Sequence, residues 1–120
     1  MDILVIIIKV IILLSILKVW LLNYNKSTPW RGGEANSMKQ EFANYGLPEW
    51  MLPTVGVLKV GCAIILFISI WFPSVEALGG YGIAILMLGA IAMHIKISDP
   101  IKKSLPAFLF LVLAILAVIL

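Results

Sequence analysis

The sequence of 120 residues is 62% hydrophobic and only 12% charged. Soluble domains are close to half apolar and a quarter charged, so this composition excludes an ordinary water-soluble domain. The formal net charge is +3, but the basic side chains flank apolar runs, so we expect a lipid bilayer and no nucleic acid as their partner. The length suits one integral membrane domain over residues 1–120.

Four apolar runs are long enough to cross a bilayer, whose hydrocarbon core of about 30 Å requires about 20 helical residues. Lys9 and Lys18 interrupt the first run and no small-residue cleavage pattern follows it, so we expect an uncleaved helix there. The sequence therefore predicts an all-α fold, a four-helix transmembrane bundle. The expected spans are about 3–22, 51–72, 76–97 and 104–120, with a polar loop over 23–50.

The polar loop 23–50, or loop 1, carries a periodic pattern of its own. Apolar side chains recur at helical spacing in a set that is followed by Gly46, a residue typical of the position after a helix. This pattern predicts a short amphipathic helix that lies on the membrane surface. A plain solvated turn is the alternative. The apolar residues of the pattern are Ala35, Met38, Phe42 and Tyr45.

Four spans place both chain termini on one side of the membrane. Loops 1 and 3 carry basic side chains, whereas loop 2 and the two ends of the chain carry none. Because basic loops are retained in the cytoplasm, we expect loops 1 and 3 to be cytoplasmic and both termini to lie outside. The basic residues of these loops are Lys26, Arg31, Lys39, Lys96, Lys102 and Lys103.

Lys59 is the most informative residue of the second span. Trp50 and Trp71 bracket this span about 31 Å apart, and Lys59 lies about 12 Å inside its Trp50 end. Trp prefers the headgroup level, so both rings are expected at the interfaces. No acid of the chain lies deep in an apolar run. Lys59 therefore snorkels, pairs with a folded-back loop acid such as Glu41, meets an anionic or carbonyl ligand, meets another subunit, or is neutral.

Three further polar side chains lie in the apolar runs. Lys9 lies toward the outer face, where Glu76 begins the third span, so we predict a Lys9–Glu76 ion pair, with a lipid-facing Lys9 as the alternative. His94 lies near the cytoplasmic end of the third span as an interfacial or capping residue, or else as a ligand or proton-relay contact. Cys62 is expected to serve packing. One His and one Cys do not make a metal site, and no catalytic set is visible.

Small residues recur along the second and third spans. Gly56 and Gly61 lie in the second, and Gly82 and Gly89 are seven residues apart on one face of the third. Glycine lets helix backbones approach closely in lipid, so these four positions are predicted to pack against neighbouring helices.

Several of these residues together resemble the DoxX-like family of small bacterial membrane proteins. The resemblance runs from about Asn36 to the end of the chain. It implies a four-helix protein of the bacterial cytoplasmic (inner) membrane. Some relatives carry Glu where this chain has Lys59, and the paired cysteines of thiol-handling relatives are missing. The residues that carry the resemblance are Tyr45-Gly46-Leu47-Pro48, Gly56 before Lys59, Gly61, and Ala92 with His94.

The resemblance favours an accessory subunit or assembly factor of a membrane complex, such as an oxidoreductase complex, that is not catalytic alone. The alternative is a binding or redox module for a quinone or another lipid-like molecule. A third hypothesis is a small transporter or channel formed by a homo-oligomer, because a single chain of 120 residues is too short to enclose a pore by itself. The residues expected to bind the ligand in the second hypothesis are Lys59, His94, Tyr45 and Trp50.

Overall fold

The computed structural model describes all residues except 1–2, 23–31, 34 and 36, so the predicted basic residues Lys26 and Arg31 lie outside the described part. Four of its helical segments are long and apolar enough to cross a membrane, which confirms the predicted all-α bundle. The helices are α1 (Ile3–Leu17), η1 (Lys18–Leu22), α2 (Met38–Asn44), α3 (Met51–Ile68), η2 (Pro73–Val75), α4 (Glu76–Lys96), η3 (Ile101–Ser104) and α5 (Leu105–Ile119).

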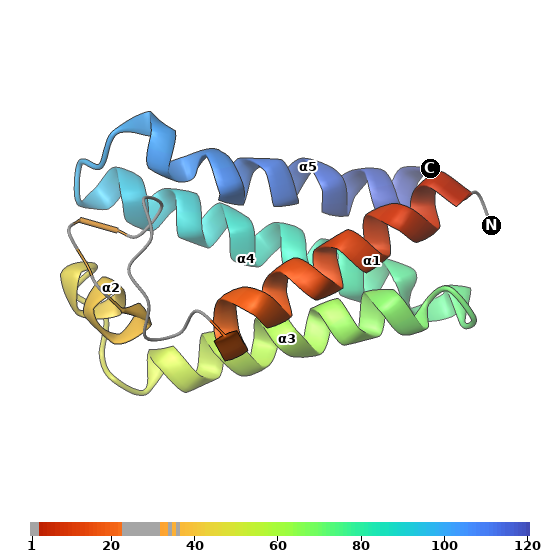
Figure 1. Ribbon diagram of the computed structural model, residues 1–120, viewed down its shortest axis with the longest axis horizontal. Coiled ribbons are helices and arrows are strands. Elements are labelled where there is room, and N and C mark those ends of the chain that lie inside the picture. Colours follow the sequence, from red (N-terminus) through yellow and green to blue (C-terminus); the bar gives the residue numbers. More distant parts are fainter. Residues whose placement is uncertain (1–2, 23–31, 34, 36) are drawn as a thin grey trace.

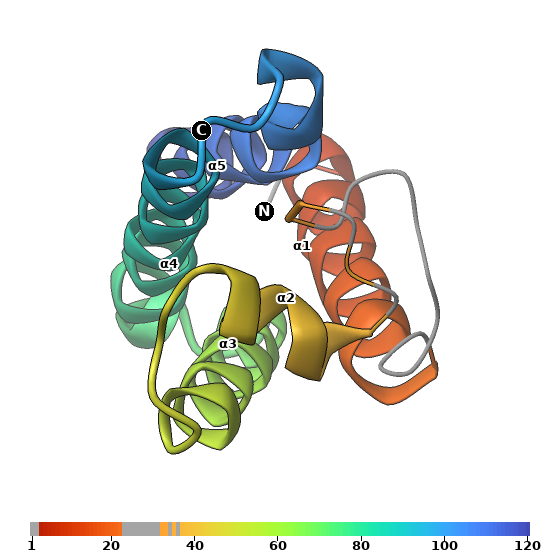
Figure 2. The same ribbon diagram turned by 90° about the vertical axis from the view of Figure 1, so that its left-hand side faces the viewer.

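The four long helices form a ring in which α1 contacts α3 and α5, and α4 contacts the same two helices from the other side (Figures 1 and 2). Each helix runs antiparallel to its neighbours, as short connections favour. Both chain ends lie at one end of the bundle, and α2 lies at the other (Figure 1). Toward α2 the helices α3 and α4 diverge, and α2 lies across the widened end (Figure 2).

The second span is shorter than the sequence predicted. Helix α3 ends at Ile68 rather than at residue 72, and a turn leads to Phe72, whose backbone is extended at φ −125° and ψ 79°. The residue before a proline is disfavoured in the helical region, so Pro73 forces Phe72 out of the helix.

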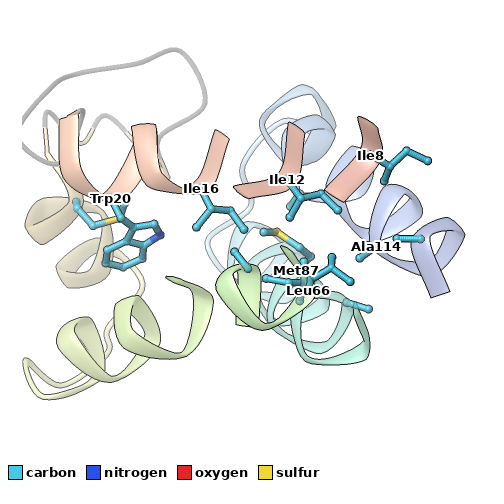
Figure 3. Close-up of a cluster of buried hydrophobic side chains, with 13 residues drawn as sticks. Ile8, Ile12, Ile16, Trp20, Leu66, Met87 and Ala114 are labelled. Atoms are coloured by element: carbon cyan, nitrogen blue, oxygen red, sulfur yellow. The ribbon is translucent and has the colours of Figure 1, made fainter. Parts of the chain in front are cut away.

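The core is built on one stripe of α1. Ile8, Ile12, Ile16 and Trp20 recur every four residues and are at most 9% exposed. The first three meet Leu66 and other buried side chains of α3, α4 and α5. Trp20, by contrast, is set apart along the bundle (Figure 3). The outer faces of all four spans are apolar and exposed, as lipid-facing surfaces are expected to be.

Glycines set the close approach of α3 and α4 near the end that holds the termini. A Cβ at Gly79 would lie 2.6 Å from the backbone nitrogen of Leu66, and one at Gly82 would lie 2.6 Å from Cys62 Sγ. Distances below 3.0 Å leave no room for a methyl group, so the two backbones meet closely only because these residues are Gly. Cys62 thus lies in this seam.

The four glycines named from the sequence behave differently. Gly56 packs against the ring of Trp20, which would lie 2.8 Å from an added Cβ. Around Gly61 and Gly89 no heavy atom lies within 4 Å of that position, so the close packing expected at these two residues does not occur within the chain. A Cβ at Gly80 would overlap Cγ2 of Val118 in α5, so Gly80 packs closely against that helix.

The loop 1 helix α2 is defined by its ends. The hydroxyl of Ser37 accepts a hydrogen bond from the backbone N–H of Gln40 at 3.2 Å, so Ser37 is the N-cap of the helix. Gly46 follows the helix with φ +74°, which glycine adopts without strain. Met38 and Tyr45 are 4% and 5% exposed. The apolar face of α2 therefore packs on the bundle, and not on lipid as the surface-helix prediction had it.

Candidate functional site

A cavity of about 430 Å³ lies at the end of the bundle where α3 and α4 diverge, beneath α2. Its walls are formed mainly by apolar side chains from all four spans. A few polar side chains converge on it, which is the usual composition of a small-molecule site. Those polar residues are Ser15, Glu41, Tyr45, Lys59, His94 and Lys103.

Lys59 reaches the cavity from α3. Met51, Val55 and Lys59 are four residues apart, so they share the face of α3 that lines the cavity. The Lys59 ammonium lies 5.7 Å from the ring centroid of Trp20, within the range of a cation–π contact. It forms no ion pair or hydrogen bond with any residue that the structure describes. Glu41 attracts it from a longer distance.

Trp20 takes the place that the sequence had suggested for Trp50. Trp50 is 64% exposed and does not line the cavity, so the structure does not bring it together with the other three predicted ligand residues. Trp20 lies in η1, a π-helical continuation of α1 over Lys18–Leu22, and turns its ring inward. Such segments recur at functional sites. The missed signal was an aromatic residue four positions beyond Ile16 on the core stripe of the first span.

Tyr45 and His94 meet as expected, and a chain of hydrogen bonds runs through them. The Tyr45 hydroxyl donates to Glu41 Oε1 at 2.7 Å and lies 3.4 Å from His94 Nε2. The other ring nitrogen of His94, Nδ1, lies 2.8 Å from Asp99 Oδ2. The side chain of His94 is 6% exposed. This chain of hydrogen bonds starts in the cavity, which is lined by Glu41, Tyr45 and His94. It ends at Asp99 in loop 3, outside the cavity.

Asp99 fastens loop 1 to loop 3. Its two carboxylate oxygens accept from the backbone N–H of Gly33 at 3.0 and 3.2 Å, and Lys103 Nζ lies 3.8 Å from Oδ1. Lys103 also donates to the Gly33 carbonyl oxygen. Burial raises the pKa of the Asp99 carboxyl, but the bonds from His94 and Gly33 and the charge of Lys103 outweigh it and hold the pKa below its ordinary value. The sequence analysis assigned Asp99 no role at this site.

Loop 1 is held to the bundle by a further basic residue. Lys96 Nζ donates to the backbone carbonyl oxygen of Tyr45 at 2.9 Å. Asn44 donates from Nδ2 to the carbonyl oxygen of Gly32 at 3.2 Å, and the N–H of Gly32 donates to Glu41 Oε1 at 3.1 Å. These contacts fix the position of Tyr45 over the cavity.

The predicted pair of Lys9 and Glu76 lies at the opposite end of the bundle. Lys9 Nζ is 2.7 Å from Glu76 Oε2, and the Lys9 side chain is fully buried. The two residues therefore meet within the protein and take no part in the cavity. Among the described residues, no group of three or more His, Cys, Asp or Glu side chains is placed to hold a metal ion.

Four apolar spans around a partly polar cavity define a small multi-pass membrane protein with an internal cavity. A comparison with known protein families refines this class, because residues 30–117 match the DoxX-like family. The chain belongs to this family, as the sequence had indicated. No curated protein and no solved structure gave a significant match.

Proposed function

We propose that this chain binds a small lipid-like molecule with a quinone-type head in the cavity beneath α2. The observation that carries the proposal is the Lys59 ammonium, which lines an apolar cavity and has no ion pair or hydrogen bond with a described residue. Withdrawing a cation from water costs free energy unless a polar partner replaces the water. A carbonyl oxygen of a bound head group is such a partner.

The size and walls of the cavity support this ligand class. A volume of about 430 Å³ lies within the range of about 300–1,000 Å³ that is typical of ligand sites. Met38, Met51, Met87 and Met93 all line it. Methionine is flexible and polarisable, so these walls suit a substituted ring or a branched tail.

The cavity also reaches the lipid-facing surface of the bundle. Ile85 lies near the middle of α4 and is 68% exposed, yet it lines the cavity. Val19 on the opposite side is 39% exposed and lines it too. A ligand that partitions into the bilayer therefore has a lateral route to Lys59 that does not pass through the loops.

Replacing Lys59 by Met tests the proposal with decylubiquinone as the probe. We expect the purified wild-type protein in detergent to quench its Trp fluorescence on binding, and Lys59→Met to bind at least about tenfold more weakly, because a hydrogen bond from a charged donor is lost. Lys18→Met is the matched control, since Lys18 is exposed and outside the cavity. Equal affinities for all three proteins, or no binding by the wild type, would sink the proposal.

We also propose that the chain acts as an accessory subunit or assembly factor of a larger complex in the bacterial cytoplasmic membrane. The open position at Gly61 favours this role, because no heavy atom lies within 4 Å of an added Cβ there and a helix from outside the chain has room to approach. A single cysteine at this position should form specific crosslinks to a second polypeptide in membranes. Crosslinks to no protein would count against a partner there.

The orientation with loops 1 and 3 in the cytoplasm is part of the same proposal. The described lysines of these loops, Lys39, Lys96, Lys102 and Lys103, lie at the α2 end of the bundle, whereas the termini lie at the other (Figure 1). A cysteine at exposed Lys102 should then resist a membrane-impermeant maleimide in intact cells and react after lysis. Rapid labelling of intact cells would reverse the orientation.

A further inference from the structure

The hydroxyl of Tyr45 lies between two groups that can each accept its proton. Glu41 Oε1 is 2.7 Å away and His94 Nε2 is 3.4 Å away. A phenol has one proton to donate, so it can serve only one of them at a time. When the hydroxyl donates to Glu41, the nearer group, it can still accept a hydrogen bond from His94. When it turns to His94, it accepts from a protonated Glu41.

His94 connects the Tyr45 hydroxyl to a group outside the cavity. Its Nε2 faces Tyr45 and its Nδ1 faces Asp99 at 2.8 Å. An imidazole can take a proton on one nitrogen and release one from the other, which allows it to pass protons between two partners. Asp99 does not line the cavity, whereas Glu41 does. The four groups thus connect the interior of the cavity with loop 3.

We propose that Glu41, Tyr45, His94 and Asp99 carry protons between the cavity and the loop face, and that the cavity's ligand therefore bears an acidic hydroxyl on its ring. This inference rests on the proposed function and narrows its ligand class. In the outward direction the ligand O–H bond breaks and a Glu41 O–H bond forms. Tyr45 then takes this proton and gives its own to His94 Nε2, while Nδ1 releases one to Asp99. Asp99 then gives a proton to water at the loop face, so one proton has entered the four groups and one has left them, and no electron moves.

The charges around the chain are arranged for proton transfer in both directions. Lys59 lines the same cavity and stabilises the oxygen anion that the ligand becomes. Lys103 and the N–H of Gly33 stabilise Asp99 as an anion. Lys96 touches the backbone of Tyr45 and not its hydroxyl, so it does not compete for the proton.

An alkylated 2-hydroxy-1,4-naphthoquinone, lapachol, is a suitable probe because its hydroxyl ionises with a visible colour change. Protein with bound lapachol is subjected to a stopped-flow pH jump, and the rate of ionisation is read from the absorbance. We expect Tyr45→Phe to slow this rate, measured with the site saturated by lapachol, by about 100-fold, the size of a lost acid–base step. Tyr81→Phe, on the exposed face of α4, is the matched control.

His94→Ala provides an independent measurement should the Tyr45 variant fail to fold. The rate should fall with this variant as well and recover when free imidazole is added, which a merely structural role would not produce. A wild-type rate in Tyr45→Phe, or no recovery with imidazole, overturns the proton path and leaves ligand binding intact. No binding of lapachol by the wild type overturns both proposals.

Discussion

The two ends of the bundle treat a lysine in an apolar helix in opposite ways. At the terminal end the ammonium of Lys9 is fully buried and lies 2.7 Å from Glu76. At the α2 end Lys59 is half-buried, lines a cavity and has no ion-pair partner among the described residues. The first arrangement is complete within the chain. The second leaves a charged donor facing a space of ligand size.

The packing of the helices differs in the same sense. At the terminal end Gly79 brings α4 against the backbone of α3 at Leu66, so no space is left between them. Nearer α2, Gly89 has nothing within 4 Å of the position of a Cβ, and the helices diverge. The comparison teaches that one end is closed by packing and the other holds an open cavity. We expect the first to contribute stability and the second to bind the ligand, and substitutions at matched positions test that division.

The largest expected effect is at the terminal end. Glu76→Gln removes a carboxylate from a buried ammonium, and we expect a loss of about 3 kcal/mol in the free energy of unfolding, as for other half-deleted buried pairs. Thermal unfolding in detergent measures it, with exposed Glu49→Gln as the control. The double variant Lys9→Met, Glu76→Gln should recover most of the loss. A change below about 0.5 kcal/mol in the single variant would show that the pair is not stabilising.

The glycine seam gives the next largest effect. Gly79→Ala places a methyl group 2.6 Å from the Leu66 backbone nitrogen, and we expect a cost of about 2 kcal/mol from the forced separation of the helices. Gly89→Ala meets no atom and should stabilise by up to about 1 kcal/mol through helix propensity. Unfolding of the two variants under one set of conditions is the measurement. Equal changes in the free energy of unfolding for the two variants would show that α3 and α4 do not pack differently at Gly79 and Gly89.

Lys59→Met should have a smaller effect of opposite sign. Removing a charge that lacks an ion-pair partner is expected to stabilise the ligand-free protein by about 1 kcal/mol, a part of the cost of a lysine inside a membrane span. Glu76→Gln is expected to lower the free energy of unfolding and Lys59→Met to raise it, so the two ends of the bundle should respond with opposite signs. Destabilisation of the ligand-free protein by Lys59→Met would indicate that Lys59 holds the fold together.

The smallest effect concerns pH and the contact between loops 1 and 3. The folded pKa of Asp99 is lowered, so its contribution to stability is complete above the ordinary carboxyl pKa of about 3.9 and is lost as pH falls through the folded value. We therefore expect the Gly33 amide to stay protected from hydrogen exchange from neutral pH down to about pH 4 and to lose this protection below it. Asp99→Asn should remove this acid dependence. An unchanged profile in that variant would assign it to another group.

Much of the architecture could be predicted from the sequence. Long apolar runs between polar segments predicted four spans, and Gly46 correctly marked the end of α2. The contact between Lys9 and Glu76 could also be predicted, since both residues lie toward the same face of the membrane. The sequence did not decide which way Trp50 faces, because a Trp at a span boundary has the same sequence signal whether its ring faces lipid or a cavity.

The sequence by itself determined that the chain forms apolar membrane-spanning helices, because the thickness of the bilayer and the need to satisfy backbone hydrogen bonds act on each segment separately. Only the tertiary structure decided which buried cation finds a carboxylate, that Trp20 lines the site, and that Asp99 meets His94 from across a turn. These outcomes depend on how helices are rotated and spread apart relative to one another, which is a property of their joint packing and not of any single run of residues.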